Sequence, residues 1–95
     1  MRAEYDSEAR ALQIVLADAE PWTDGDEIAG LQVAYAGGVA AGIEVLRPDI
    51  ATVAARLAPV AERLGVDAQE VAAVAQAALA VPDREVTLAV GRPYR

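Results

Sequence analysis

The sequence predicts an α+β fold: an antiparallel β-meander of about four strands, two helices packed on one face of it, and a C-terminal edge strand. Two changes of pattern predict this arrangement. Apolar residues alternate with polar ones over much of residues 1–46, and recur at helical spacing over residues 47–82. Alternation returns in residues 83–95, which predicts a last strand and a tail. Because no break in composition separates these parts, we expect residues 1–95 to form a single domain.

Two short strands open the meander. The apolar residues of each share a face: Ala3 and Tyr5 in residues 2–6, and Leu12, Ile14 and Leu16 in residues 11–17. Asp6 and Ser7 between them are turn formers, because their side chains can bond nearby backbone amides. Residues 18–30 are polar and contain Pro21, Gly25 and Gly30. We expect a loop there, with at most a short strand around residues 21–23.

A hairpin follows, and its register decides which side chains are buried. The apolar residues are Leu31, Val33 and Tyr35 in the first strand, and Val39, Ala41, Ile43 and Val45 in the second. A two-residue turn at Gly37-Gly38 would pair Ala36 with Val39 and place these two sets on opposite faces. A three-residue loop over residues 36–38 pairs Tyr35 with Val39 and Val33 with Ala41, which brings both sets to one face. Because a one-residue slip flips every side chain, we expect the longer loop, with Gly38 in the left-handed position.

The first helix is expected to begin at Asp49, whose side chain can cap it. Its apolar stripe comprises Ile50, Val53, Ala54 and Leu57. Pro59 lacks an amide hydrogen and clashes with the carbonyl four residues back, so we expect a break or kink near Ala58. Gly65 is the expected C-terminal cap.

The second helix is expected to start at Asp67, which forms a variant of the capping box with Glu70. Its apolar stripe comprises Val71, Val74, Ala75, Ala78 and Leu79. Pro82 and Asp83 end it. Val86, Leu88 and Val90 then alternate inward in the last strand.

The residue inventory argues against catalysis. The chain contains no cysteine, histidine or lysine, and Ser7 is its single serine. These absences remove thiol, imidazole and Schiff-base chemistry. Paired carboxylates can hydrolyse glycosides, but only in a cleft that perturbs them, and a thin sheet offers little cleft. We therefore expect no enzyme activity, no catalytic residue and no cofactor.

The net charge of −7 lies in the first half of the chain. Residues 1–46 hold nine acids and two arginines, whereas residues 47–95 hold six of each. An acidic surface repels phosphate backbones and anionic membranes, so we expect neither a nucleic acid nor a membrane as partner. The helical hairpin has helix-turn-helix spacing around Gly65, but residues 67–80 contain no arginine to contact phosphates. No signal-peptide pattern or long apolar run is present, so we expect a cytoplasmic protein.

Two segments of residues 1–46 carry a family resemblance. The chain opens with Glu4-Tyr5-Asp6-Ser7-Glu8-Ala9 and continues with Ala11-Leu12, Ile14 and Leu16, and its hairpin ends in Gly42-Ile43-Glu44-Val45-Leu46. In order and spacing these residues resemble the family catalogued as domain of unknown function 2283. The chain departs from that family's pattern at Arg10, Gln13, Ala34 and Ala36, where members usually carry acids or, at the second position, an aromatic residue. The resemblance implies a small antiparallel meander and carries over no activity, cofactor or catalytic residue.

One sheet face should stay free of the helices. It bears Gln13, Val15, Gln32, Ala34, Ala40 and Gly42, and we expect it to be small and weakly polar. An antiparallel sheet tolerates one wet face, so this surface is either solvated or an interface. Trp22 either anchors an interface, since tryptophan is enriched at such sites, or folds back over the sheet edge. The candidate partner-binding residues are Trp22, Gln13, Val15, Gln32 and Glu44.

Three hypotheses of function follow. The first is a non-enzymatic protein-interaction module, with a homodimer through the weakly polar face or a free strand edge as one form. The second is an acidic, antitoxin-like partner that neutralises a small basic protein, which the charge asymmetry supports. The third is a small-ligand or metal-binding domain, in which the acids of residues 18–27 would hold a divalent cation, although their spacing is not that of an EF-hand.

Overall fold

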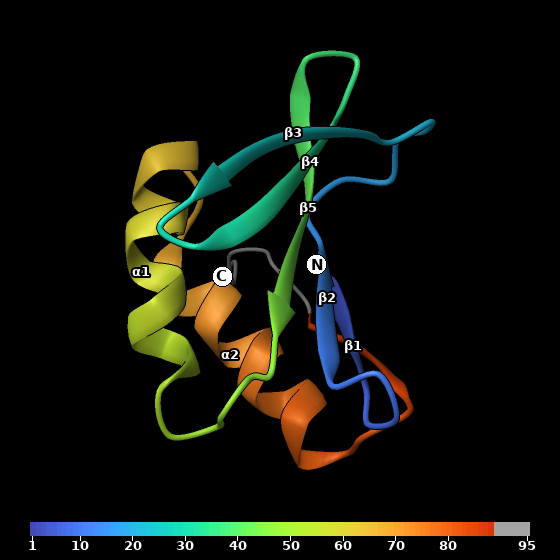
Figure 1. Ribbon diagram of the computed structural model, residues 1–95, viewed down its shortest axis with the longest axis vertical. Coiled ribbons are helices and arrows are strands. Elements are labelled where there is room, and N and C mark those ends of the chain that lie inside the picture. Colours follow the sequence, from blue (N-terminus) through green and yellow to red (C-terminus); the bar gives the residue numbers. More distant parts are fainter. Residues whose placement is uncertain (89–95) are drawn as a thin grey trace, which may run out of the picture.

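The computed structural model describes residues 1–88, which form one sheet and two helices (Figure 1). The strands are β1 (Arg2–Asp6), β2 (Ala11–Val15), β3 (Thr23–Ile28), β4 (Leu31–Ala36), β5 (Val39–Leu46) and β6 (Glu85–Thr87). The helices are α1 (Val53–Leu64) and α2 (Ala68–Ala80), which lie between β5 and β6 in the chain. The α+β class is therefore confirmed. The expected inward position of Val90 lies outside the described residues.

All six strands belong to one antiparallel sheet, in the order β3-β4-β5-β2-β1-β6. Both helices lie on the same side of this sheet, with α2 against β1, β2 and β6, and α1 against α2 (Figure 1). The C-terminal strand β6 pairs with β1 at one edge, as predicted. Neither helix in the described part of the chain is long and apolar enough to cross a membrane. The sheet thus has one covered face and one face without helices.

The core lies between the sheet and the helices, and 13 of its 16 residues are predicted positions, the exceptions being Ile28, Val60 and Ala61. From the sheet it takes Ala3, Leu12, Ile14, Ile28, Leu31, Val33, Ile43 and Val45, and from the helices Val53, Leu57, Val60, Ala61, Val71, Val74, Ala75 and Ala78. Each of these side chains is buried. The period-two and helical patterns therefore identified the buried side of each element they covered.

Strand β3 was not predicted, because the sequence indicated a loop over residues 18–30. The strand forms one edge of the sheet and pairs with β4, with a bulge between Asp24 and Asp26. Gly25 occupies this bulge, and a Cβ at that position would overlap the ring of Tyr35. Ile28 is buried whereas Gly25, Asp26 and Glu27 are exposed, so the strand lacks the apolar alternation that marks a half-buried strand. Acidic residues and a bulge also protect an edge from pairing with other chains.

The β4–β5 hairpin reaches the predicted burial by a different turn. Ala36 pairs with Val39, so the turn holds two residues, Gly37 and Gly38, and the expected three-residue loop is wrong. Both glycines have positive φ, 60° and 82°, which suits the tight turn that matches strand twist.

A β-bulge, and not a longer loop, provides the one-residue shift in register between β4 and β5. Tyr35 pairs with Ala40 but Ala34 pairs with Gly42, so Ala41 is the extra residue. The oxygen of Ala41 accepts hydrogen bonds from the amides of Leu16 and Ala17, at 2.8 and 3.3 Å. Beyond the bulge Val33 pairs with Ile43, and both are buried. Ala40, expected on the free face, packs against the core, and Val39, expected in the core, is 59% exposed.

Helix α1 differs from the prediction at its start and at Pro59. Asp49 forms a turn ahead of the helix, in which its carboxylate accepts from the amide of Ala51 at 2.8 Å, and α1 itself begins at Val53. Ile50 consequently lies outside the helix and is exposed. The helix continues through Pro59 without the expected break. Because Ala55 and Pro59 are both exposed, water can solvate the carbonyl that the missing amide leaves unpaired.

The predicted caps at Gly65 and Asp67 are confirmed, whereas the reciprocal bond of a capping box, from Asp67 N–H to the side chain of Glu70, is not among the hydrogen bonds of the described residues. Gly65 caps α1 in the left-handed region, with φ 73°, and its amide bonds the carbonyl of Glu62. Asp67 caps α2 by accepting from the amides of Gln69 and Glu70, at 2.8 and 3.2 Å. Helix α2 ends at Ala80, before Pro82.

Asp83 ties the connection after α2 to the β1–β2 turn. Its carboxylate accepts from the hydroxyl of Ser7 at 2.7 Å and from the amide of Ser7 at 2.9 Å. These two bonds, the hydroxyl first, lower the pKa of Asp83 below its usual range. A carboxylate whose pKa is lower in the folded than in the unfolded state stabilises the folded state at pH values above the unfolded pKa. This stabilisation is lost as the pH falls through the folded pKa.

We therefore expect Ser7→Ala to lower stability at neutral pH and to lower it less in acid. Urea unfolding of the natural chain and of the variant between about pH 7 and about pH 2 measures this difference. The range includes the pKa of an unperturbed aspartate, which is about 3.9. The two stability curves should converge as Asp83 becomes protonated. A difference that stays constant over this range would show that the Ser7–Asp83 bonds do not depend on the charge of Asp83.

Candidate functional site

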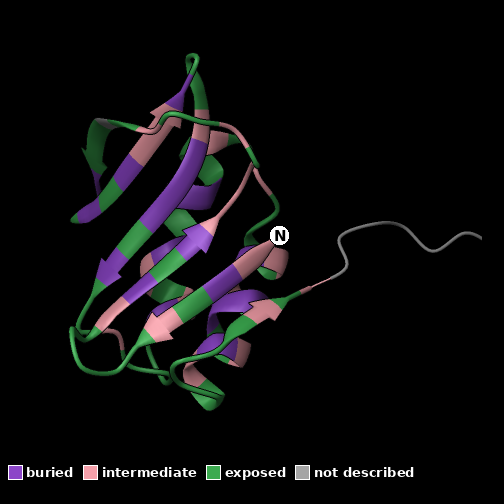
Figure 2. Cartoon of the chain, turned by 90° about the vertical axis from the view of Figure 1, so that its right-hand side faces the viewer, coloured by how far each residue is buried: buried purple, intermediate pink, exposed green. Residues whose placement is uncertain are grey.

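The sheet face opposite the helices, here called the open face, is the surface considered as the candidate site. In β2, in residues 31–33 of β4 and in residues 43–46 of β5, buried residues alternate with exposed or half-buried ones (Figure 2). The side chains of the open face are positioned by the backbone register of the sheet, so neighbours across strands are fixed by pairing. The open face is therefore a rigid platform.

One row of polar residues crosses the open face from edge to edge. Cross-strand pairing places one residue of each strand side by side, and all six are exposed: Glu85 of β6, Glu4 of β1, Gln13 of β2, Glu44 of β5, Gln32 of β4 and Glu27 of β3. We call this set the Glu/Gln row. Four of its members are glutamates, and Glu4 and Glu85 lie directly opposite each other. Like charges in opposite positions lower the stability of a sheet, so folding alone does not explain the row.

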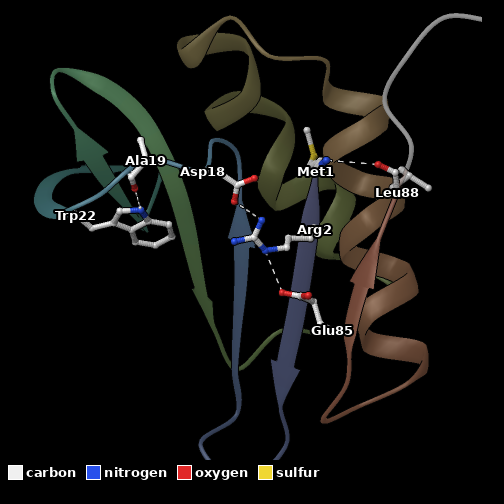
Figure 3. A network of polar contacts seen from close by, with 7 residues as sticks. All are labelled: Met1, Arg2, Asp18, Ala19, Trp22, Glu85 and Leu88. Atoms are coloured by element: carbon white, nitrogen blue, oxygen red, sulfur yellow. Dashed lines mark hydrogen bonds and ion pairs between the residues drawn. The ribbon is translucent and has the colours of Figure 1, made fainter.

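Cations are scarce on the strands. The six strands contain a single cationic residue, Arg2, against seven acids: Glu4, Asp6, Asp24, Asp26, Glu27, Glu44 and Glu85. Arg2 is itself engaged, because its guanidinium pairs with Asp18 and, at 3.0 Å, with Glu85 (Figure 3). The hydrogen bond to Asp18 is the main cause of its raised pKa. The expectation of a weakly polar face is therefore wrong, since the strand residues on it include four glutamates.

Trp22 lies on the open face, not over the sheet edge. Its indole Nε1 donates to the carbonyl of Ala19 at 2.8 Å, which fixes the loop that leads into β3 (Figure 3). The ring of Trp22 covers Gly42, and a Cβ at position 42 would overlap it. Gly42 belongs to β5, an inner strand, so the half-buried indole sits over the middle of the sheet. Glycine at this position is required by the close approach of the indole.

Two adjoining pockets flank Trp22. The smaller, of about 140 Å³, is lined by Gln13, Trp22, Gln32, Ala34, Gly42, Ile43 and Glu44. The larger, of about 560 Å³, is lined by Arg2, Gln13, Val15, Ala17, Asp18, Ala19, Glu20, Pro21, Trp22 and Glu85. Gln13 and Trp22 line both pockets. We call the smaller one the Trp22 pocket.

The structure brings the five predicted candidate residues together around these pockets. Four of them, Gln13, Trp22, Gln32 and Glu44, line the Trp22 pocket. The fifth, Val15, lines the larger pocket. The sequence reasoning missed Glu4, Glu27 and Glu85 of the row. Alternation in residues 2–6 already placed Glu4 on the polar face, whereas Glu27 could not be placed while β3 was interpreted as a loop.

The acids of residues 18–27 are dispersed. Asp18 pairs with Arg2, and a carboxylate oxygen of Asp26 accepts from the hydroxyl of Tyr35 at 3.3 Å. Burial, and then the neighbouring Asp26, raise the pKa of Tyr35. Among the side chains that the structure describes, no group of three or more acidic residues is placed to hold a metal ion.

Comparison with protein-family models, with curated proteins and with solved structures gave no match to this chain. The resemblance of residues 1–46 to domain of unknown function 2283 therefore stays a prediction.

Proposed function

We propose that this protein is a non-enzymatic interaction module that binds a basic protein through the open face. The observation that carries the proposal is the Glu/Gln row, which aligns four carboxylates across six strands, of which Glu85 alone is paired with the nearby Arg2. Such a row attracts a cationic surface and repels an anionic one.

The size of the open face suits a protein partner. Neighbouring strands lie about 4.8 Å apart, so the row of six strands is roughly 24 Å long. A stable interface covers about 800 Å² on each partner, which corresponds to a patch of similar width. The half-buried indole of Trp22 near the middle of this area resembles the aromatic anchors found at the centre of protein interfaces.

The charge pattern favours a basic partner over a second copy of the chain. Two open faces in contact would bring two Glu/Gln rows, with four glutamates each, toward one another. Like charges brought together at an interface cost several kcal/mol. The β3 edge is also poorly suited to self-pairing, because it is bulged and acidic. The same charge pattern suits the hypothesis that this chain is an acidic, antitoxin-like partner of a small basic protein.

Affinity purification from the native cell tests the proposal. Three baits are compared: the natural chain, a row variant carrying Glu4→Gln, Glu27→Gln and Glu44→Gln, and a control variant carrying Glu8→Gln, Glu62→Gln and Glu70→Gln. Both variants change the net charge by the same amount, but the control positions lie in the β1–β2 turn and on the helices. Glutamine already occupies two positions of the row, so the substitutions keep its side-chain shape.

The proposal predicts that a basic protein co-purifies with the natural and control chains, and that the row variant loses it. The loss should be at least about tenfold, because three charge pairs at a desolvated interface contribute well over about 1.4 kcal/mol. Binding should also weaken with added salt. Equal recovery by the row and control variants, or an acidic partner, would contradict the proposal. Recovery of the chain alone as a stable dimer would contradict it as well.

A further inference from the structure

We propose that the Trp22 pocket binds one arginine side chain of the basic partner. This inference rests on the proposed function and specifies its chemistry. It follows from two features of the pocket: an aromatic wall, and a carboxylate between two amides.

The wall and the size of the pocket suit an arginine side chain. Trp22 lines the pocket, and the ring of tryptophan is the best aromatic partner for a cation. Gly42 and Ala34 are cross-strand neighbours that also line the pocket, and the ring of Trp22 lies over Gly42. A volume of about 140 Å³ accommodates a single long side chain rather than a drug-sized ligand. The guanidinium group is planar and weakly hydrated, so it stacks on such a ring more readily than an ammonium group does.

The polar atoms of the pocket are chiefly acceptors for a cation. Glu44 lies between Gln13 and Gln32 in the Glu/Gln row, so its nearest cross-strand neighbours are neutral amides. The carboxylate of Glu44 can accept two parallel N–H bonds from a guanidinium, and the amide oxygens of the glutamines can accept others. No cationic residue lines this pocket in the described chain.

The open face already holds one guanidinium in comparable surroundings. Arg2 lines the adjoining pocket and lies between the carboxylates of Asp18 and Glu85 (Figure 3). Asp18, in the loop that leads to Trp22, and Glu85 of β6 thus hold one arginine on this face. The Trp22 pocket offers one carboxylate, that of Glu44, together with an aromatic wall.

Fluorescence of Trp22 tests this inference directly, because it is the only tryptophan in the chain. The probe is the capped tripeptide Gly-Arg-Gly, titrated at low salt, and the matched probe carries citrulline in place of arginine. Citrulline keeps the shape of the side chain but is neutral. We expect a saturable change with the arginine peptide, and binding at least about tenfold weaker with the citrulline peptide, because charge-assisted bonds are about twice as strong as neutral ones.

Variants locate the binding. Glu44→Gln should weaken binding of the arginine peptide by at least about tenfold, while Glu62→Gln on α1 should leave it unchanged. Gly42→Val places side-chain atoms where the indole ring lies, so it should displace Trp22 and abolish the response. Circular dichroism of each variant confirms that it is folded, and Glu44→Gln alters an exposed residue.

The outcomes separate this inference from the proposed function. Absence of a saturable response to the arginine peptide, or equal binding of the citrulline peptide, would overturn the arginine pocket. If the row variant nevertheless loses the co-purified basic protein, the proposed function stands without this pocket. If both the arginine response and the effect of the row substitutions are absent, both ideas fail.

Discussion

Replacement of Ile43 by alanine is expected to lower the free energy of unfolding by about 2–5 kcal/mol. Ile43 is 1% exposed and lies on β5, an inner strand of the sheet. It pairs with Ile14 on one side and with Val33 on the other, and both of these side chains are fully buried. Truncation therefore leaves a cavity that its neighbours can fill only in part. A domain of this size has a total stability of about 5–15 kcal/mol, so the variant should be close to unfolding.

Urea unfolding followed by circular dichroism measures this loss. Leu46→Ala is the matched control, because Leu46 lies on the same strand but is 59% exposed. Surface substitutions of this kind usually change stability by no more than about 0.5 kcal/mol. Similar costs at the two positions would mean that β5 does not face the helices as described.

Replacement of Pro59 by alanine is expected to raise the free energy of unfolding by about 2 kcal/mol. Proline inside a helix costs about 3 kcal/mol relative to alanine, and part of this is offset because proline also restricts the unfolded chain, by about 0.4–1 kcal/mol. Pro59 lies within α1 and is exposed, so alanine introduces no clash. The substitution also restores an amide that can bond the carbonyl of Ala55.

Thermal and urea unfolding of Pro59→Ala test this expectation. Pro82→Ala is the control, because Pro82 is exposed and follows the end of α2, where no helical hydrogen bond is missing. The control should bring no gain, since it only frees the unfolded chain. A fall in stability for Pro59→Ala would show that the proline shapes α1 in a way that the core requires.

The sequence was informative wherever a strand or helix buries one face. Leu12 and Ile14, or Val71 and Val74, recur at the period of their element because the core selects apolar side chains there. The caps at Gly65 and Asp67 were also predictable, because each depends on a local backbone geometry that few residues satisfy.

Three features depend on tertiary context and could not be predicted in this way. Strand β3 has no apolar alternation, because it is held at the edge through backbone pairing with β4. Either a longer loop or a bulge at Ala41 can bring the apolar residues of β4 and β5 to the same face. The hydrophobic pattern does not distinguish these two arrangements. The break expected at Pro59 does not occur, because packing of α1 outweighs a local propensity.

The candidate site, too, combines features that the sequence could predict with features that depend on tertiary context. Gln13, Gln32 and Glu44 could be placed on one face from alternation alone, since period two fixes the face of each residue. Their alignment in a single row required the register, which includes the bulge at Ala41. The position of Trp22 over Gly42 required the path of a loop, for which the sequence contains no periodic signal.

Amide chemical-shift mapping of the labelled protein with its co-purified basic partner tests the central claim most directly. The account predicts that the largest shifts fall on strand residues of the Glu/Gln row and on the indole of Trp22. The amide signals of residues on the exposed sides of α1 and α2 should not shift. Shifts concentrated on the helices, with the open face unchanged, would contradict the account.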